Sequence, residues 1–177
     1  MTTMTAVQDE VIGKGMAFPM DAAVDRYAAE HDLPIEIARE HERELKRFLS
    51  LCALNPEVSY GMSGPVDDLW HTFITYTRDY AEFCDQVAGH FIHHVPTDPN
   101  NGAEDGGYGR MLEAYAATFG EAAPAEFWPQ GEYAGSAAQC APTHTQCAPA
   151  HTQCSPTHTQ CGVAGEAHTQ CGVTTAV

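Results

Sequence analysis

The C-terminal part of the sequence repeats a four-residue unit, His-Thr-Gln-Cys, that contains two metal-ligating side chains. Each histidine precedes a cysteine by three residues, and a further cysteine stands before the first unit. The candidate metal ligands are Cys140, His144, Cys147, His151, Cys154, His158, Cys161, His168 and Cys171. Two units supply the Cys₂His₂ set that Zn²⁺ accepts in tetrahedral sites, and thiolates also favour Cu(I). The repeats therefore predict a protein that binds a soft metal ion, Cu or Zn, as its cofactor and partner.

The residues between these ligands argue against a coiled coil and against a compact zinc finger. The first three units recur every seven residues, but Pro142, Pro149 and Pro156 would break a helix at each repeat. Residues 134–177 contain one charged side chain, Glu166, no aromatic residue and no aliphatic residue larger than Val. Such a segment cannot bury enough apolar area to offset its ordering entropy. We therefore expect residues 134–177 to form a disordered repeat tail.

Three other interpretations of the repeats stay open. Repeat expansion without a selected role would also give nearly identical units, and disulfides would need an oxidising compartment. The third alternative is a precursor of a ribosomally synthesised, post-translationally modified peptide. In that case the repeats would be multiple cores that offer Cys thiols and Thr hydroxyls. The residues before them would form a helical leader on which a modifying enzyme docks.

A second group of polar residues lies in the part of the chain before the repeats. Asp67 and His71 are four residues apart, so they share one face of a helix. His93 and His94 follow the end of that predicted helix and could fold back toward it, giving an Asp/His cluster suited to Zn²⁺ or Fe²⁺. One alternative is a structural staple, in which His71 hydrogen-bonds Asp67 and a backbone carbonyl and pins the loop at His93 and His94. A catalytic role for the cluster is the other alternative.

The same region carries a resemblance to a known family. Val66–Phe73 contains an Asp and a Trp-His pair, Tyr80–Cys84 reads Tyr-Ala-Glu-Phe-Cys, and Gly89–Pro96 ends in His-His-Val-Pro. This order and spacing resembles the bacterial relatives of the glycine-rich domain-containing protein family, over about residues 30–120. The resemblance implies a small helical domain and no established biochemical activity.

Apolar spacing and the positions of Pro and Gly predict an all-α domain, a small bundle of four or five helices over residues 1–133. Helices are expected over residues 21–30, 34–54, 65–89 and 108–119. The helix over residues 65–89 is expected to be either straight or bent near Asp79. Pro34 and Pro65 suit first helical positions, and Gly120 suits the residue after a helix end.

Composition narrows the function classes. The chain has 177 residues and a formal net charge of −16, and its 8 basic residues are scattered, so nucleic-acid binding through phosphate contacts is not expected. No apolar run approaches the ~20 residues that span a bilayer, and no secretory signal is recognisable. No membrane contact and a cytoplasmic location are therefore expected. Because no HExxH, CxxC, nucleophile elbow or phosphate loop is present, the protein is not expected to be an enzyme.

Overall fold

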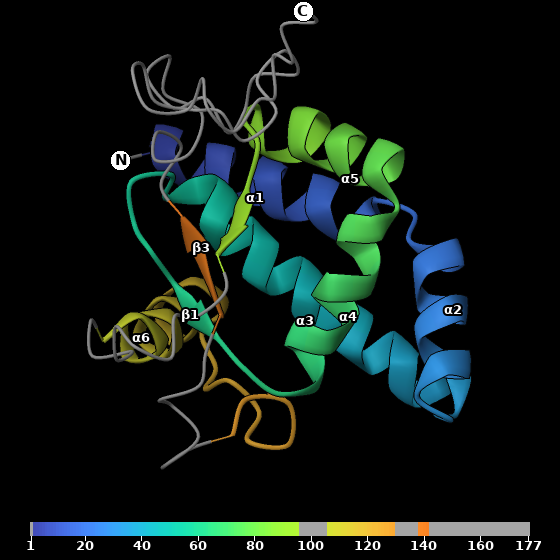
Figure 1. Ribbon diagram of the computed structural model, residues 1–177. Coiled ribbons are helices and arrows are strands. Elements are labelled where there is room, and N and C mark those ends of the chain that lie inside the picture. Colours follow the sequence, from blue (N-terminus) through green and yellow to red (C-terminus); the bar gives the residue numbers. More distant parts are fainter. Residues whose placement is uncertain (1, 96–105, 130–137, 142–177) are drawn as a thin grey trace, which may run out of the picture. The chain divides into compact units, whose positions relative to one another are not determined.

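The structure is a computed structural model that describes residues 2–95, 106–129 and 138–141 (Figure 1). All of these residues belong to one compact unit, residues 1–143. Its helices are α1 (Thr2–Ala17), α2 (Asp21–Glu30), α3 (Ile35–Leu54), α4 (Pro65–Thr75), α5 (Thr77–Phe83), the π-helical turn η1 (Cys84–Ala88) and α6 (Gly107–Phe119). Its strands are β1 (Gly61–Met62), β2 (His93–Val95) and β3 (Ala138–Ala141). The expected all-α class is confirmed, because helices account for most of the described residues. Within those residues, no helix combines the length and the apolar character needed to cross a membrane.

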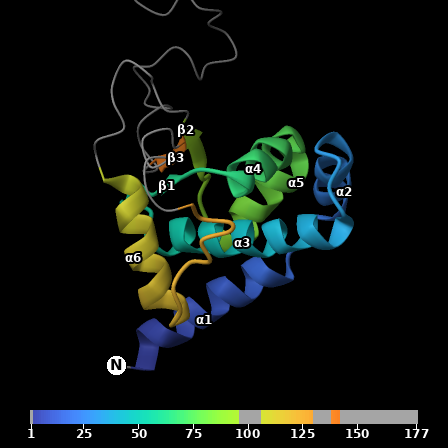
Figure 2. The ribbon, with the colours of Figure 1, turned by 90° about the horizontal axis from the view of Figure 1, so that it is seen from below.

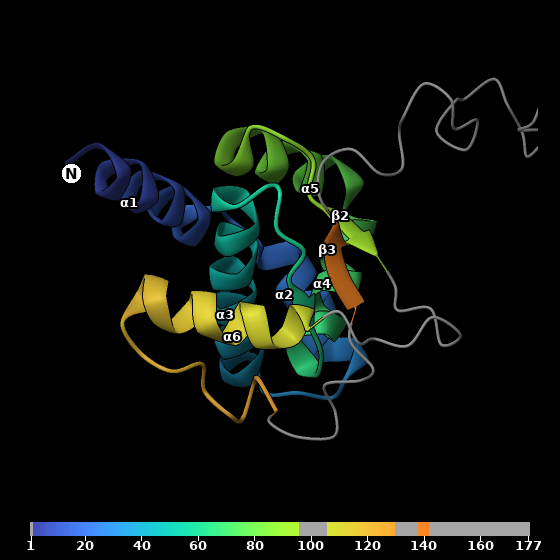
Figure 3. The same ribbon diagram turned by 90° about the vertical axis from the view of Figure 1, so that its left-hand side faces the viewer.

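Helix α3 is the central element of the unit. Leu45, Phe48 and Leu49 are fully buried, at the spacing of three and four residues that keeps one helix face inward. Helices α1, α2, α4 and α6 all pack against α3. Figure 2 shows α1 and α4 on opposite sides of α3, and Figure 3 shows α6 lying crosswise to it. The core therefore surrounds α3.

The helix predicted over residues 65–89 is divided at Tyr76. The backbone of Tyr76 leaves the helical region (φ −82°, ψ 63°), so α4 and α5 meet there, before the expected bend at Asp79. The Tyr76 hydroxyl donates to the carbonyl of Ala22 at 3.0 Å, which ties the break to α2. Gly89 ends the π-helical turn with φ 71°, a left-handed conformation that glycine adopts without steric cost.

Helix α1 lies outside the four segments predicted to be helical. Its Val11 is partly buried against the core, and Gly15 lies so close to Ser50 that an added Cβ would come within 2.6 Å of the hydroxyl. Phe18, just after the helix, packs edge-on against Phe83 with ring centroids 5.2 Å apart. Tertiary packing holds α1 in place, and the spacing of apolar residues within the segment does not predict the helix.

Two tryptophans and one carboxylate organise the core on one side of α3. Trp70 and Trp128 are fully buried and flank Phe48, with ring centroids 5.5 Å and 5.9 Å from it. The side chain of Glu44 is also fully buried. Its Oε2 accepts hydrogen bonds from the Tyr115 hydroxyl at 2.8 Å and from the Trp128 indole N–H at 2.9 Å. These bonds tie α6 and the residues that follow it to α3.

A small antiparallel sheet joins distant parts of the unit. Strand β3 lies between β1 and β2, and Gln139 pairs with both Gly61 and Val95. The four residues of β3 are strand, although the sequence predicts disorder for all of residues 134–177. Backbone pairing with two neighbours does not require the large side chains that this segment lacks. The remaining residues of the predicted tail lie outside the described residues.

Candidate metal centre

Helix α4 carries Asp67 and His71 one turn apart. The chain enters the helix through Gly64, whose φ of 80° suits glycine, and Pro65 occupies the start of the helix. Asp67 lies in the first turn, where the helix dipole stabilises a negative charge. Its side chain is 16% exposed and that of His71 is 54% exposed. The helix therefore presents one largely covered carboxylate and one solvent-facing imidazole on the same face.

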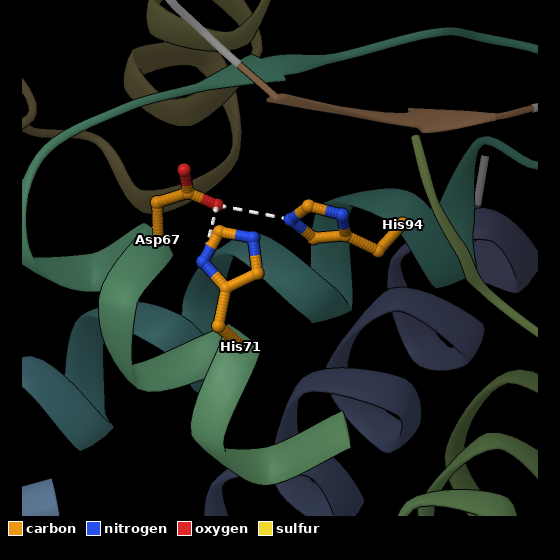
Figure 4. Close-up of side chains that lie close together, drawn as sticks. All are labelled: Asp67, His71 and His94. Carbon is orange, nitrogen blue, oxygen red and sulfur yellow. Dashed lines mark hydrogen bonds and ion pairs between the residues drawn. The ribbon is translucent and has the colours of Figure 1, made fainter. Parts of the chain in front are cut away.

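The third member of the cluster is His94, in strand β2. Its Nε2 atom lies 3.0 Å from Asp67 Oδ1, and its side chain is 7% exposed. The imidazole stands edge-on to the Trp70 ring at a centroid distance of 4.5 Å and lies 4.4 Å from the His71 ring. Figure 4 shows the three polar side chains pointing toward one another. Packing against Trp70 holds the His94 ring where Asp67 can bond it.

The three donor groups have the spacing of an incomplete ligand set. One ligand atom from each of Asp67, His71 and His94 lies within 4.8 Å of the other two. His71 Nδ1 is 3.9 Å from Asp67 Oδ1, compared with 3.0 Å for His94 Nε2. In a tetrahedral Zn²⁺ site with bonds of about 2.0–2.1 Å, ligand atoms lie roughly 3.3 Å apart. Small side-chain rotations would therefore bring the three atoms to one ion and leave a fourth position open.

The contacts of Asp67 also fit a structural staple, but its histidine partner differs from the expected one. The expected staple joins His71 to Asp67, but the hydrogen bond in the structure joins His94 to Asp67. At 3.9 Å, His71 Nδ1 is too far from the carboxylate for a hydrogen bond. The staple therefore links β2 to the start of α4, and His71 lies at the solvent edge of the pair.

His93 lies apart from this cluster. Successive residues of a strand point to opposite faces, so His93 and His94 diverge. The His93 ring packs 5.0 Å from the Phe91 ring. Burial, together with the neighbouring His90, lowers the pKa of His93. The structure brings His94, but not His93, to Asp67.

Strand β2 is anchored to the core by the residue before it. The Tyr80 hydroxyl donates to the carbonyl of Ile92, and the Ile92 amide donates to Cys84 Sγ at 3.5 Å. Burial raises the pKa of Cys84, so this thiol stays protonated near neutral pH. These contacts position the strand that carries His94.

A second buried polar cluster, which the sequence does not predict, lies next to the first turn of α4. The Tyr27 hydroxyl donates to the carbonyl of Pro65 at 3.1 Å and lies 2.9 Å from His41 Nδ1. Burial raises the pKa of Tyr27 to about 12 and lowers the pKa of His41. The available signal is a histidine on the buried face of α3, three residues after Ala38. This cluster braces the start of the helix that carries Asp67.

Of the ligands predicted in the repeats, Cys140 falls in a described element. Its backbone pairs with that of His94 in the register of β2 and β3. The other eight lie outside the described residues: His144, Cys147, His151, Cys154, His158, Cys161, His168 and Cys171.

Comparison with known proteins identifies the family. No curated protein and no solved structure matches the chain. The resemblance to the glycine-rich domain-containing protein family is wrong, because the family model that matches is a different one, UCP032817-like, over residues 14–109. That range contains Asp67, His71 and His94, and its description names no activity. With more than half of its length matched by the family model, the chain belongs to the UCP032817-like family.

Proposed function

We propose that the protein binds transition-metal ions at two places, the cluster of Asp67, His71 and His94 and the His-Thr-Gln-Cys repeats. The observation that carries this proposal is the approach of three ligand atoms to within 4.8 Å of one another. Two imidazoles and a carboxylate suit Zn²⁺ or Fe²⁺ at the cluster. The thiols of the repeats, free in the reducing cytoplasm that the sequence leads us to expect, favour Cu(I) and Zn²⁺.

The proposed role is binding without catalysis. Asp67 and His94 already form a hydrogen-bonded pair, so an ion would exchange that bond for two coordinate bonds. The exposed His71 side chain gives the ion a route in from solvent and supplies the third ligand. Because neutral imidazole and carboxylate are the ligand forms, binding releases protons and weakens as the pH falls.

Metal titration of the full-length, reduced protein tests the cluster. Co²⁺ replaces Zn²⁺ in tetrahedral sites and provides an absorption signal. We expect His71→Ala to bind one ion fewer than the parent, while the thiolate sites of the repeats persist. His31→Ala, which also removes an exposed histidine, is the matched control and should bind as the parent does. Equal capacity in the parent and in His71→Ala would contradict the cluster as a metal site.

A second candidate function is the modified-peptide precursor, favoured by the near-identity of the tandem units. The helical unit would then act as the leader on which a modifying enzyme docks. The intact mass of the protein isolated from its native host distinguishes the two candidates. Mass changes that scale with the number of units would support the precursor, and an unchanged mass with bound metal would support the metal-binding protein.

A further inference from the structure

Strands β1 and β2 are held apart in the sheet by β3, which pairs with both. Gln139 lies opposite Gly61 on one side and opposite Val95 on the other. In a central antiparallel strand, the backbone groups of successive residues bond to one neighbour and then to the other. Without β3, the sheet would present two strand edges with the width of one strand between them. We call the place between these two edges, which β3 occupies, the central strand position.

Besides pairing with β3, each flanking strand is tied to the helical core by contacts that do not involve β3. Next to β1, the Arg110 guanidinium donates to the Ser59 carbonyl at 3.0 Å, and Met62 in β1 is fully buried. Next to β2, the Tyr80 hydroxyl donates to the Ile92 carbonyl. A site whose two walls are held by other contacts is preorganised, so exchanging its occupant costs little ordering of the walls.

The sequence of β3 recurs in the repeats. Residues 139–142 read Gln-Cys-Ala-Pro, residues 146–149 read the same, and residues 153–156 read Gln-Cys-Ser-Pro. Strand β3 ends at Ala141, directly before the proline, which cannot donate to a strand ladder. The repeats also have Thr before Gln where β3 has Ala138, and Thr favours strands more than Ala does. The repeat units therefore share the sequence of the segment that occupies the central strand position.

We propose that the central strand position is a docking site for Gln-Cys-Ala-Pro and Gln-Cys-Ser-Pro segments of this chain's own repeats. Residues 138–141 are then one of several interchangeable occupants. Recognition rests on backbone pairing with Gly61, Met62 and β2, which is how sheet edges accept extended peptides. A unit docked in the register of β3 would bring its cysteine to the position opposite His94, which Cys140 holds in the structure. The folded unit would thereby engage one repeat at a time beside the Asp67 cluster.

Hydrogen exchange of the full-length chain without metal tests the docking site, read at the backbone amides of His93–Val95. In the Gln139→Pro variant, proline removes an amide that the central strand needs. We expect the β2 amides to keep their parental protection, because the unit at residues 146–149 takes the vacated position. A second variant carries Gln139→Pro, Gln146→Pro, Gln153→Pro, Gln160→Pro and Gln170→Pro. With every unit blocked, we expect the protection of β2 to be lost.

The matched control carries the last four of these substitutions and keeps Gln139, so it should exchange as the parent does. Amides of α3 report in each variant that the helical core is folded. If Gln139→Pro alone loses as much protection at His93–Val95 as the variant with all five prolines, the proposal is overturned. Retained protection in the five-proline variant would overturn it equally, because β2 would then not depend on an occupant. No metal is present, so neither result bears on the proposed metal cluster.

Discussion

Replacing Glu44 by alanine should destabilise the unit more than any surface substitution, because this fully buried carboxylate accepts two hydrogen bonds from buried donors. The Tyr115 hydroxyl donates to Glu44 Oε2 at 2.8 Å, and the Trp128 indole N–H donates to the same oxygen at 2.9 Å. Removing the acceptor of a buried donor costs about 1–3 kcal/mol, so two donors give about 2–6 kcal/mol. Relief of the desolvated charge offsets part of this cost. We therefore expect Glu44→Ala to lower the free energy of unfolding by about 3–5 kcal/mol.

Urea unfolding followed by tryptophan fluorescence and by far-ultraviolet circular dichroism measures this loss, with an unchanged m value as the sign of two-state behaviour. Glu44→Gln keeps one acceptor oxygen but loses the charge, so it should cost only about 1–2 kcal/mol. Glu36→Ala, on the exposed face of the same helix, is the control and should stay within about 0.5 kcal/mol of the parent. A Glu44→Ala protein as stable as Glu36→Ala would refute the idea that this carboxylate holds α6 to α3.

Burial lowers the pKa of His41, so the unfolded chain binds a proton more readily than the folded one. The stability that neutral, buried His41 contributes is complete above about pH 6.5 and is lost as the pH falls from there toward the folded-state pKa. The free energy of unfolding of His41→Gln, measured between pH 5 and pH 8, should therefore depend less on pH than that of the parent. Asp67→Ala should lower the melting temperature of the metal-free protein, because His94 loses its hydrogen-bond partner at a cost of about 1–3 kcal/mol; an unchanged melt would mean that this bond contributes nothing. A chain ending at Thr143 should keep the helical circular dichroism signal and a cooperative melt, because every described element precedes that residue. Reduced peptides of one, two and four His-Thr-Gln-Cys units, titrated with Zn²⁺ or Cu(I) against a chromogenic chelator, should bind in proportion to unit number, with two units completing a first Zn²⁺ site; capacity independent of cysteine would contradict metal binding by the repeats.

The helix ends that proline and glycine mark can be predicted from the sequence. Helix α3 begins directly after Pro34, and α6 ends directly before Gly120, which has φ 72°. The break at Tyr76 cannot be predicted in this way, because it involves no proline or glycine and is tied to a hydrogen bond with Ala22. Helix α1 is equally hidden, since its contacts are with residues far along the chain.

Part of the candidate site can also be predicted from a short stretch of sequence. The spacing of four residues is enough to place Asp67 and His71 on one helix face. Choosing His94 over His93 requires the orientation of strand β2, which its pairing with β3 and its anchor in the core determine. The exchange of His71 for His94 as the partner of Asp67 likewise depends on how closely two separate elements approach. Contacts of this kind are not encoded in a short stretch of sequence.

The central position of β3 has a consequence for synthesis on the ribosome. Strands β1 and β2 are complete once Val95 has been made, whereas β3 ends at Ala141. If β1 and β2 form as they are made, the nascent chain carries strand edges without their partner β3 while the intervening residues are translated. These edges are 2 and 3 residues long, shorter than the segments of about six residues that stack into cross-β aggregates. We therefore expect the sheet to close late in co-translational folding, and we expect such short edges to give little opportunity for edge-to-edge association of nascent chains.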